Sequence, residues 1–192
     1  MELGVSRAPV REAIRMLEQE HLIVRHPHRG LFVASPTAGE ILQVASYRAL
    51  LEIYAVRWGR PHSRDEIDAL DRACDAMDVA AVRGDVLAAV TEDLRFHGIV
   101  ASVCDNAALL GHFHELDGHM ALFLHALTDN DRGGRAAAMG DRHREVARAL
   151  AGGPDAADPA IREHYRSASL ALIERSSDDT AGVDWSSKWR LA

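Results

Sequence analysis

The sequence has no apolar run that approaches 18 residues, only two cysteines, and none of the short motifs that mark common enzyme active sites. The first absence excludes a membrane-spanning helix, and the N-terminus is not a signal peptide, so we expect a soluble, cytoplasmic protein. Cys74 and Cys104 form no CxxC pair, which favours buried thiols over a disulfide or thiolate metal ligands. Without a nucleophile elbow or a phosphate loop, the sequence does not favour an enzyme.

Strict alternation of polar and apolar residues is also absent after residue 36, where apolar residues recur at helical spacing. Breaks rich in Gly, Pro and Asp separate the periodic stretches. Ser63 and Glu66 form a capping-box signature, and Asp158 and Pro159 are expected at the N-cap and first position of the last helix. The predicted helices span 37–58, 64–83, 86–104, 106–128, 135–151 and 159–176.

These patterns predict a mainly α protein with three parts. We expect a small N-terminal domain at 1–36, an all-helical antiparallel bundle at 37–176 and a poorly ordered tail at 177–192. The net charge is −7, which does not suit a nucleic-acid partner, but the first part holds five arginines against four glutamates. A DNA-binding surface would therefore have to be a local basic face in this part.

The N-terminal stretch has the pattern of the second half of a DNA-binding winged helix. Gly4 supplies a tight turn and Ser6 an N-cap, and three arginines then point away from an apolar helical stripe. The stripe consists of Val10, Ala13, Ile14 and Leu17, and the arginines are Arg7, Arg11 and Arg15. Two short β-rich runs then flank a tip at His28, Arg29 and Gly30, which predicts a hairpin that could reach a phosphate or a minor groove.

Histidine is in clear excess, with eleven residues in the chain. Four polar residues interrupt helix stripes that are otherwise apolar: Asp93 and His97 on one helix, His143 on a second and His164 on a third. A buried carboxylate stays ionised only near a compensating cation, and an i, i+4 pair brings two ligands to one side of an ion. Three imidazoles and one carboxylate on three helices predict a site for a divalent metal, such as zinc, nickel or manganese. The alternative is that each histidine is a core residue satisfied by a neighbour.

Arg48 is a further charged residue on an apolar stripe, that of the first bundle helix. An inward-facing guanidinium can hold a carboxylate in a bidentate fork, which would suit an acidic ligand. The alternative is an ion pair with Glu52 or with an acidic residue of another helix. Of the other histidines, His112 and His119 are candidates to line the same cavity, and His114 and His125 are expected at the surface.

Two sets of motifs resemble one bacterial family. The run Ser-Arg-Ala-Pro-Val-Arg-Glu-Ala at 6–13, with Arg-Gly at the hairpin tip, resembles the GntR family of transcription regulators. The helical domain, with Asp93-x-x-x-His97 followed by His143 and His164, resembles the FCD ligand-binding domain of the FadR subfamily, where such residues bind a divalent metal. Because that family's winged helix starts with a further helix and most of a second, and only three residues precede Gly4 here, we expect a partial winged helix-turn-helix.

The resemblance implies a metabolite-responsive transcription regulator that is not an enzyme and that forms a homodimer. Operator DNA would be contacted by residues of the helix and the wing, namely Ser6, Arg7, Arg11, His28, Arg29 and Gly30. The effector would be a small organic acid whose carboxylate completes the metal sphere, with Arg48 as a further contact. Two alternatives use the same Asp and His residues: a metal-dependent hydrolase, which would activate water, and a sensor deficient in DNA binding.

Overall fold

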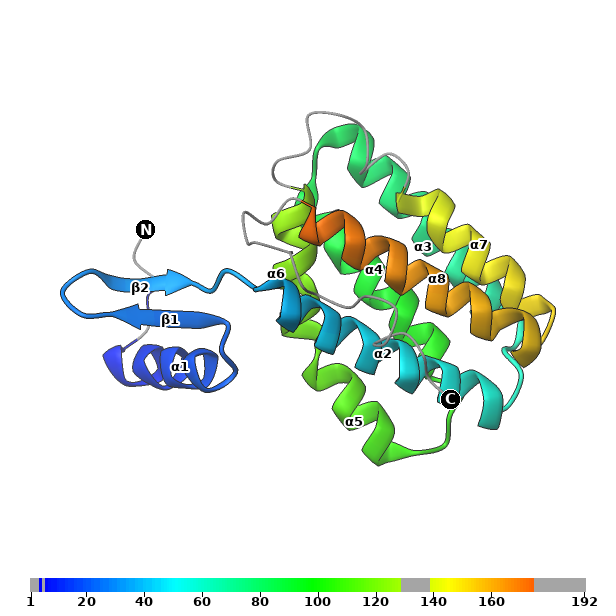
Figure 1. Ribbon diagram of the computed structural model, residues 1–192, viewed down its shortest axis with the longest axis horizontal. Helices are drawn as coiled ribbons and strands as arrows, with labels where there is room; N and C mark the ends of the chain where they lie inside the picture. Colours follow the sequence, from blue (N-terminus) through cyan, green and yellow to red (C-terminus); the bar gives the residue numbers. More distant parts are fainter. Residues whose placement is uncertain (1–3, 5, 129–138, 175–192) are drawn as a thin grey trace. The chain divides into compact units, whose positions relative to one another are not determined.

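The computed structural model describes residues 4, 6–128 and 139–174. The chain divides into two compact units, an N-terminal unit of residues 1–36 and a helical unit of residues 37–192 (Figure 1). The tail predicted at 177–192, and the first four residues of the helix predicted at 135–151, lie outside the described residues.

The N-terminal unit contains helix α1 (Arg7–Gln19) and a hairpin of strands β1 (Ile23–His26) and β2 (Gly30–Val33). The strands are antiparallel, with His26 opposite Gly30. His28 in the turn and Gly30 after it both have positive φ angles, of 61° and 98°, so the wing tip depends on a glycine at position 30. Ser6 occupies the N-cap position of α1 as predicted, but its side chain makes no capping hydrogen bond.

No described residue of the N-terminal unit is buried. The stripe predicted to be apolar on α1 is only partly covered, and Leu17 keeps 38% of its surface exposed. On the hairpin Phe32 is 46% exposed. The unit therefore contributes little burial of apolar surface, in agreement with its small size.

The helical unit holds seven helices in its described residues, with a large core and a smaller apolar cluster, so the mainly α class is confirmed. Its long helices run beside one another, with α2 against α8 and α3 against both α4 and α7 (Figure 1). Side chains from α2, α3, α4, α6, α7 and α8 fill the core. The helices are α2 (Ala38–Trp58), α3 (Arg64–Arg83), α4 (Val86–Ala101), α5 (Ala107–Glu115), α6 (Asp117–Thr128), α7 (Met139–Ala151) and α8 (Pro154–Ile173).

Local signals explain where several helices begin. Ser63 and Glu66 form the predicted capping box of α3, and Thr37 and Glu40 form a second one at the start of α2. A close crossing then fixes α7 against α3: a Cβ on Gly140 would lie only 2.7 Å from the carbonyl oxygen of Cys74. Only glycine allows this approach, which sets the depth at which the inner face of α7 enters the core.

Several of the predicted helix boundaries are wrong. The helix predicted at 106–128 is broken at Leu116 into α5 and α6. The last helix begins at Pro154 rather than at Pro159, because Gly153 takes the N-cap position with a positive φ of 85° and Pro154 takes the first helical position. Pro159 then lies inside α8.

Asp158 is accordingly not an N-cap. Its carboxylate pairs with Arg162 of α8 and with Arg57 of α2. Burial raises the pKa of Asp158, but the two guanidinium groups outweigh it and lower the pKa overall.

Helix α4 also ends at Ala101, three residues earlier than predicted. Within residues 6–128 and 139–174, no helix combines the length and the apolar character needed to cross a bilayer.

Candidate metal centre

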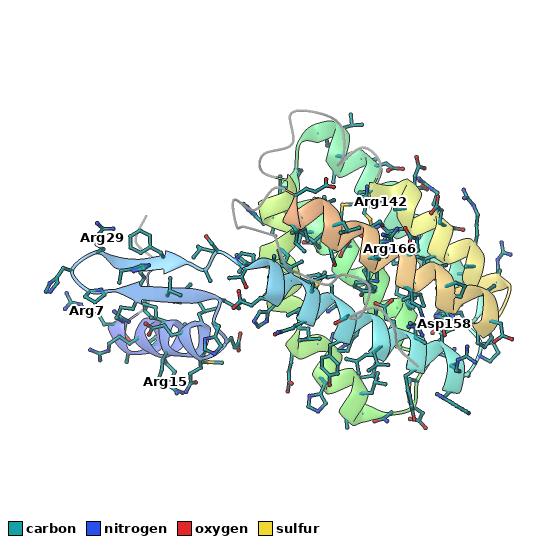
Figure 2. The ribbon with its side chains drawn as sticks, in the orientation of Figure 1. Arg7, Arg15, Arg29, Arg142, Asp158 and Arg166 are labelled. Carbon is teal, nitrogen blue, oxygen red and sulfur yellow. The ribbon has the colours of Figure 1, made fainter. Side chains whose placement is uncertain are left out.

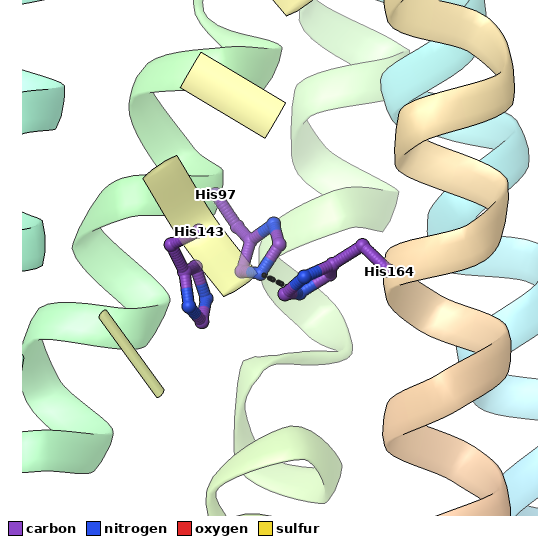
Figure 3. Close-up of side chains that lie close together, drawn as sticks. All are labelled: His97, His143 and His164. Atoms are coloured by element: carbon purple, nitrogen blue, oxygen red, sulfur yellow. Dashed lines mark hydrogen bonds between the residues drawn. The ribbon is translucent and has the colours of Figure 1, made fainter. Parts of the chain in front are cut away.

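The four residues predicted as metal ligands are all buried in the core of the helical unit. Asp93 and His97 come from α4, His143 from α7 and His164 from α8, and between 1% and 8% of each residue is exposed. One ring nitrogen from each histidine lies within 4.8 Å of the other two (Figure 3). Two nitrogens on opposite sides of one ion are about 4.2 Å apart, so this group, the His cluster, has nearly the dimensions of a metal site.

His143 presents a lone pair to a carboxylate. Its Nδ1 lies 2.7 Å from the carbonyl oxygen of Met139, and because a carbonyl can only accept, Nδ1 carries the hydrogen. In the neutral ring Nε2 is then an acceptor, yet it lies 3.0 Å from Oδ1 of Asp93 and forms no hydrogen bond there. The second carboxylate oxygen, Oδ2, also lacks a hydrogen-bond partner among the described residues. Two acceptors this close repel each other unless a proton or a cation lies between them.

His97 contacts Glu52 through Nδ1 and His164 through Nε2. Its Nδ1 lies 2.8 Å from Oε1 of Glu52, and its Nε2 lies 3.2 Å from Nε2 of His164 (Figure 3). Tyr165 donates its phenolic hydrogen to the same Glu52 oxygen at 2.6 Å. The three imidazole rings therefore converge with nitrogen atoms inward, and His97 and His143 each have a hydrogen-bond acceptor behind them, an arrangement typical of metal-bound histidines.

The buried charged groups around the His cluster shift one another's pKa. Burial raises the pKa of Asp93, but a protonated His143, with His97 and Arg48, lowers it more, so the carboxylate is ionised when a proton or a cation lies between it and Nε2 of His143. Burial lowers the pKa of His97, and Glu52 and Asp93 raise it overall. Burial, with the neighbouring His143 and His97, lowers the pKa of His164 well below its ordinary value, so that ring is neutral and can donate a lone pair.

A cavity of about 20 Å³ lies at the cluster. It is large enough for one water molecule or ion and far too small for an organic molecule. The donors facing it are imidazole nitrogens and a carboxylate, with no thiolate, which suits zinc, nickel or manganese. The residues present thus fit a divalent ion in size, charge and donor type. The lining residues are Asp93, His97, Met120, Leu124, Met139, Arg142, His143, His164, Tyr165 and Ala168.

Arg48 is fully buried on α2. It does not line the cavity but hydrogen-bonds to Tyr165, which does. Its Nη1 donates to Oδ1 of Asp117 at 2.6 Å and to the carbonyl oxygen of Phe113 at 3.2 Å, and its Nε donates to Tyr165 at 3.2 Å. The guanidinium also stacks 3.8 Å above the centre of the Phe113 ring. The predicted alternative, a pair with an acidic residue of another helix, is thus present. Only Nη2 lacks a hydrogen-bond partner in the described part of the chain.

The other histidines lie away from this cavity. His112 and His114 are exposed on α5, where they contact Glu115 and Asp117. His125 is exposed, as predicted, and His119 is half-buried on α6 without lining the cavity. A larger groove of about 550 Å³ beside Trp58 contains none of the predicted site residues.

The residues predicted to contact DNA are all in the N-terminal unit, separate from the metal ligands. Arg7, Arg11, His28, Arg29 and Gly30 are exposed, as is Ser6. Figure 2 shows the side chains of Arg7 and Arg29 extending away from the ribbon. Arg15 pairs with Glu12 and Arg25 with Glu18, whereas Arg7 and Arg11 make no ion pair within the described residues.

Sequence reasoning missed three residues of the site. Glu52 was considered only as a partner of Arg48, although its position four residues after Arg48 places both on the inner face of α2. Tyr165 follows His164 directly and lies off the stripe used to find the histidines. Asp117 was hidden inside a predicted continuous helix, and its role depends on the break at Leu116.

Two stretches of this chain match known protein families. Residues 40–167 match the FCD domain, and residues 1–33 match the bacterial regulatory proteins of the gntR family. The FCD match covers most of the helical unit, including all four predicted metal ligands and Arg48.

Relatives and solved structures agree with these matches. A probable D-xylose utilization operon transcriptional repressor of Paenarthrobacter nicotinovorans is 28% identical over 184 residues, which cover 95% of this chain and 78% of that protein. The gluconate operon transcriptional repressor of Bacillus licheniformis is 27% identical over 64% of this chain and 51% of its own length. A putative GntR transcriptional regulator from Rhodococcus sp. RHA1 has a TM-score of 0.76 at 26% identity, with 91% of this chain and 83% of that chain covered. E. coli McbR/YncC shares the fold, with a TM-score of 0.75 at 18% identity over 90% and 82% of the two chains.

Proposed function

Because this chain belongs to the FCD-domain transcription regulators of the gntR family, which are not enzymes, we propose that it senses a small organic acid at a buried divalent-metal site. The hydrolase alternative is contradicted by this family membership. Asp93, His97, His143 and His164 are the proposed ligands of the ion, which is zinc, nickel or manganese. The observation that carries the proposal is the unsatisfied contact between Nε2 of His143 and the carboxylate of Asp93, 3.0 Å apart in a buried, ion-sized cavity.

Each ligand residue has a defined part in holding the ion. Asp93 supplies a negative charge that offsets the cost of burying a cation. His143 and His97 present Nε2 because their Nδ1 atoms face acceptors, and His164 is neutral. A divalent ion held by these four residues would supply positive charge that attracts a carboxylate.

Metal content tests this proposal directly. Protein purified in the presence of divalent metals is expected to hold close to one ion per chain by mass spectrometry, and the ion should raise the melting temperature. His164→Ala should lose most of the bound metal, whereas His125→Ala, an exposed histidine of α6, should not. A wild-type protein that binds no divalent ion after incubation with zinc, nickel and manganese contradicts the metal site.

The effector requires more room than the cavity provides. At about 20 Å³ the cavity holds an ion, so an organic acid enters only if the apolar side chains beside it move. Met120, Leu124 and Met139 line this side, and methionine repacks easily. We propose that this rearrangement, favoured by the bound acid, shifts the population of states that differ in DNA affinity.

Arg48 is the proposed second contact of the effector carboxylate, through the Nη2 group that has no partner among the described residues. A thermal-shift screen of small organic acids on the metal-loaded protein should find a few that raise the melting temperature. Arg48→Lys keeps the charge but removes the fork, so the shift should disappear while the metal remains bound. An acid that binds equally well to metal-stripped protein would contradict this arrangement.

For the DNA interface we propose that Arg7 and Arg11 of α1, with Ser6 at its start, contact operator bases and phosphates. His28, Arg29 and Gly30 would place the wing tip against the DNA backbone. The support is the exposure of these residues and the absence of acidic partners for Arg7 and Arg11 within the described residues.

The proposed homodimer is supported by an uncharged, exposed face of α2. Tyr47, Leu50, Tyr54 and Trp58 follow one another at helical spacing and are 41%, 41%, 45% and 71% exposed. Between residues 41 and 56 the charged residues of this helix, Arg48 and Glu52, are both buried. Because the face is apolar along its length, a second copy of α2 can cover it about a two-fold axis.

Sedimentation of the full chain over a concentration series tests the dimer. Leu50→Asp should shift the equilibrium to monomer, whereas Val82→Asp, at an 86% exposed position on α3, should not. A dimer that persists unchanged in Leu50→Asp shows that another surface forms the interface.

A further inference from the structure

A second layer of buried polar groups supports the His cluster from the α2 side. Glu52 has no exposed surface, and its Oε1 receives a hydrogen bond from Tyr165 while lying 2.8 Å from Nδ1 of His97. Oε2 of the same carboxylate has no hydrogen-bond partner within the described residues. A carboxylate fully buried in this way is costly and needs a positive or donating partner.

Arg48 does not fill that role by direct contact. Its hydrogen bonds go to Asp117, to the carbonyl of Phe113 and to Tyr165, and none in the described part of the chain goes to Glu52. The direct partners of the Glu52 carboxylate are therefore the ring of His97 and the hydroxyl of Tyr165.

Tyr165 fixes which way the carboxylate faces. The phenol donates its hydrogen to Oε1 of Glu52 at 2.6 Å, because a carboxylate oxygen can only accept. Arg48 in turn donates to the phenolic oxygen at 3.2 Å. The carboxylate is thus aimed at His97 by a chain of hydrogen bonds that begins on α2 and passes through α8.

We infer that Glu52 is a positioning residue for His97: it keeps a hydrogen on Nδ1 and orients the ring so that Nε2 faces the metal cavity. The inference rests on the proposed metal site and extends it to the residues behind the ligands. His143 is oriented in the same way by the neutral carbonyl of Met139. A charged acceptor does more than orient, because it also makes the imidazole a stronger donor to a cation.

Glu52→Gln separates this role from simple packing. The amide has nearly the same shape but lacks the negative charge and can turn its NH₂ group toward Nδ1. Affinity for zinc, measured by competition with a chromophoric chelator, is expected to fall about 10- to 100-fold, as for other groups that orient metal-bound histidines. The matched control is Glu163→Gln on α8, which removes the same charge beside His164 from an exposed pair with Arg166 and should leave the affinity unchanged.

A second measurement tests the positioning without any metal. In ¹⁵N-edited spectra of the metal-free protein, the Nδ1 hydrogen of His97 should be slow to exchange and shifted downfield by Glu52, and both features should be lost in Glu52→Gln. If wild-type protein binds no zinc but shows this hydrogen, the metal proposal fails and the positioning stands. If zinc affinity in Glu52→Gln stays within about twofold of wild type, or the wild-type spectra lack this hydrogen, the inference is overturned.

Discussion

Arg15 in the N-terminal unit pairs with Glu12 on an exposed face of α1, and Arg48 in the helical unit pairs with the partly buried Asp117. The side chain of Arg15 is 55% exposed, whereas that of Arg48 is wholly buried. The same contrast extends to the whole units, since the described residues of the N-terminal unit include no buried side chain while the helical unit buries a cluster of titratable groups. Charged side chains of the N-terminal unit are exposed and can contact a partner. Those buried in the helical unit interact with neighbouring residues of the same unit.

The largest expected effect separates these two arginines. Arg48→Ala should lower the free energy of unfolding by roughly 3 kcal/mol, because it leaves Tyr165 and Asp117 without their buried donor. Arg15→Ala should leave it nearly unchanged, since solvent screens an exposed pair. Urea denaturation followed by circular dichroism measures both. Equal effects would mean that burial is not what distinguishes the two pairs.

Removing a proposed metal-binding residue should weaken zinc binding by the helical unit and leave DNA binding by the N-terminal unit unchanged. His143→Ala is expected to weaken zinc binding about 100-fold or more, a free-energy loss of about 2.7 kcal/mol, and to leave DNA affinity without effector unchanged. Chelator competition and fluorescence anisotropy measure the two properties. The control is His112→Ala, an exposed histidine paired with Glu115. Wild-type zinc affinity in His143→Ala would place the ion elsewhere.

Substitutions in the N-terminal unit should give the reverse pattern. Arg7→Ala and Arg11→Ala are each expected to weaken operator binding about tenfold with unchanged zinc affinity, because each removes a phosphate or base contact. Arg15→Ala serves as the control, since Glu12 already neutralises that side chain. Anisotropy titrations of DNA flanking the gene, at two salt concentrations, measure the loss. If all three variants bind alike, α1 does not contact DNA through this face.

The smallest effect concerns pH. The pKa of His97 is raised above 6.5 by Glu52 and Asp93 despite burial, so this group stabilises the metal-free fold at low pH, and the contribution is lost as pH rises through the raised pKa. A proton on Nε2 competes with the ion, so zinc affinity should fall about tenfold for each pH unit below that pKa. The rise in melting temperature on adding zinc should therefore grow between about pH 6 and pH 8. A rise independent of pH argues against His97 as a ligand.

The parts of the site that could be predicted from sequence depend on local periodicity. Asp93, His97, His143 and His164 were predicted to face inward because each interrupts an apolar stripe at helical spacing, and all four are buried. The capping box at Ser63 was predicted for a similar reason, since its two side chains are three residues apart. The ligand role of the four residues stays a prediction.

The errors arose where a distant contact overrides a local signal. The stretch 106–128 has helical periodicity throughout, but Arg48 donates to both the Phe113 carbonyl and Asp117 and so stabilises a break at Leu116. Asp158 followed by Pro159 has the pattern of a helix start, yet Asp158 is held by Arg57 from α2.

By itself, the sequence determined that the chain has a basic helix with a hairpin, a helical domain, and four polar residues on inward faces, because these features are set by spacings of a few residues. Only the tertiary structure decided that three histidines from three helices meet in one ion-sized cavity, and that Glu52 and Tyr165 lie behind them. Arg48 and Tyr165 are 117 positions apart in the chain and hydrogen-bond in the core. Such contacts depend on how whole helices pack, which local spacing does not specify.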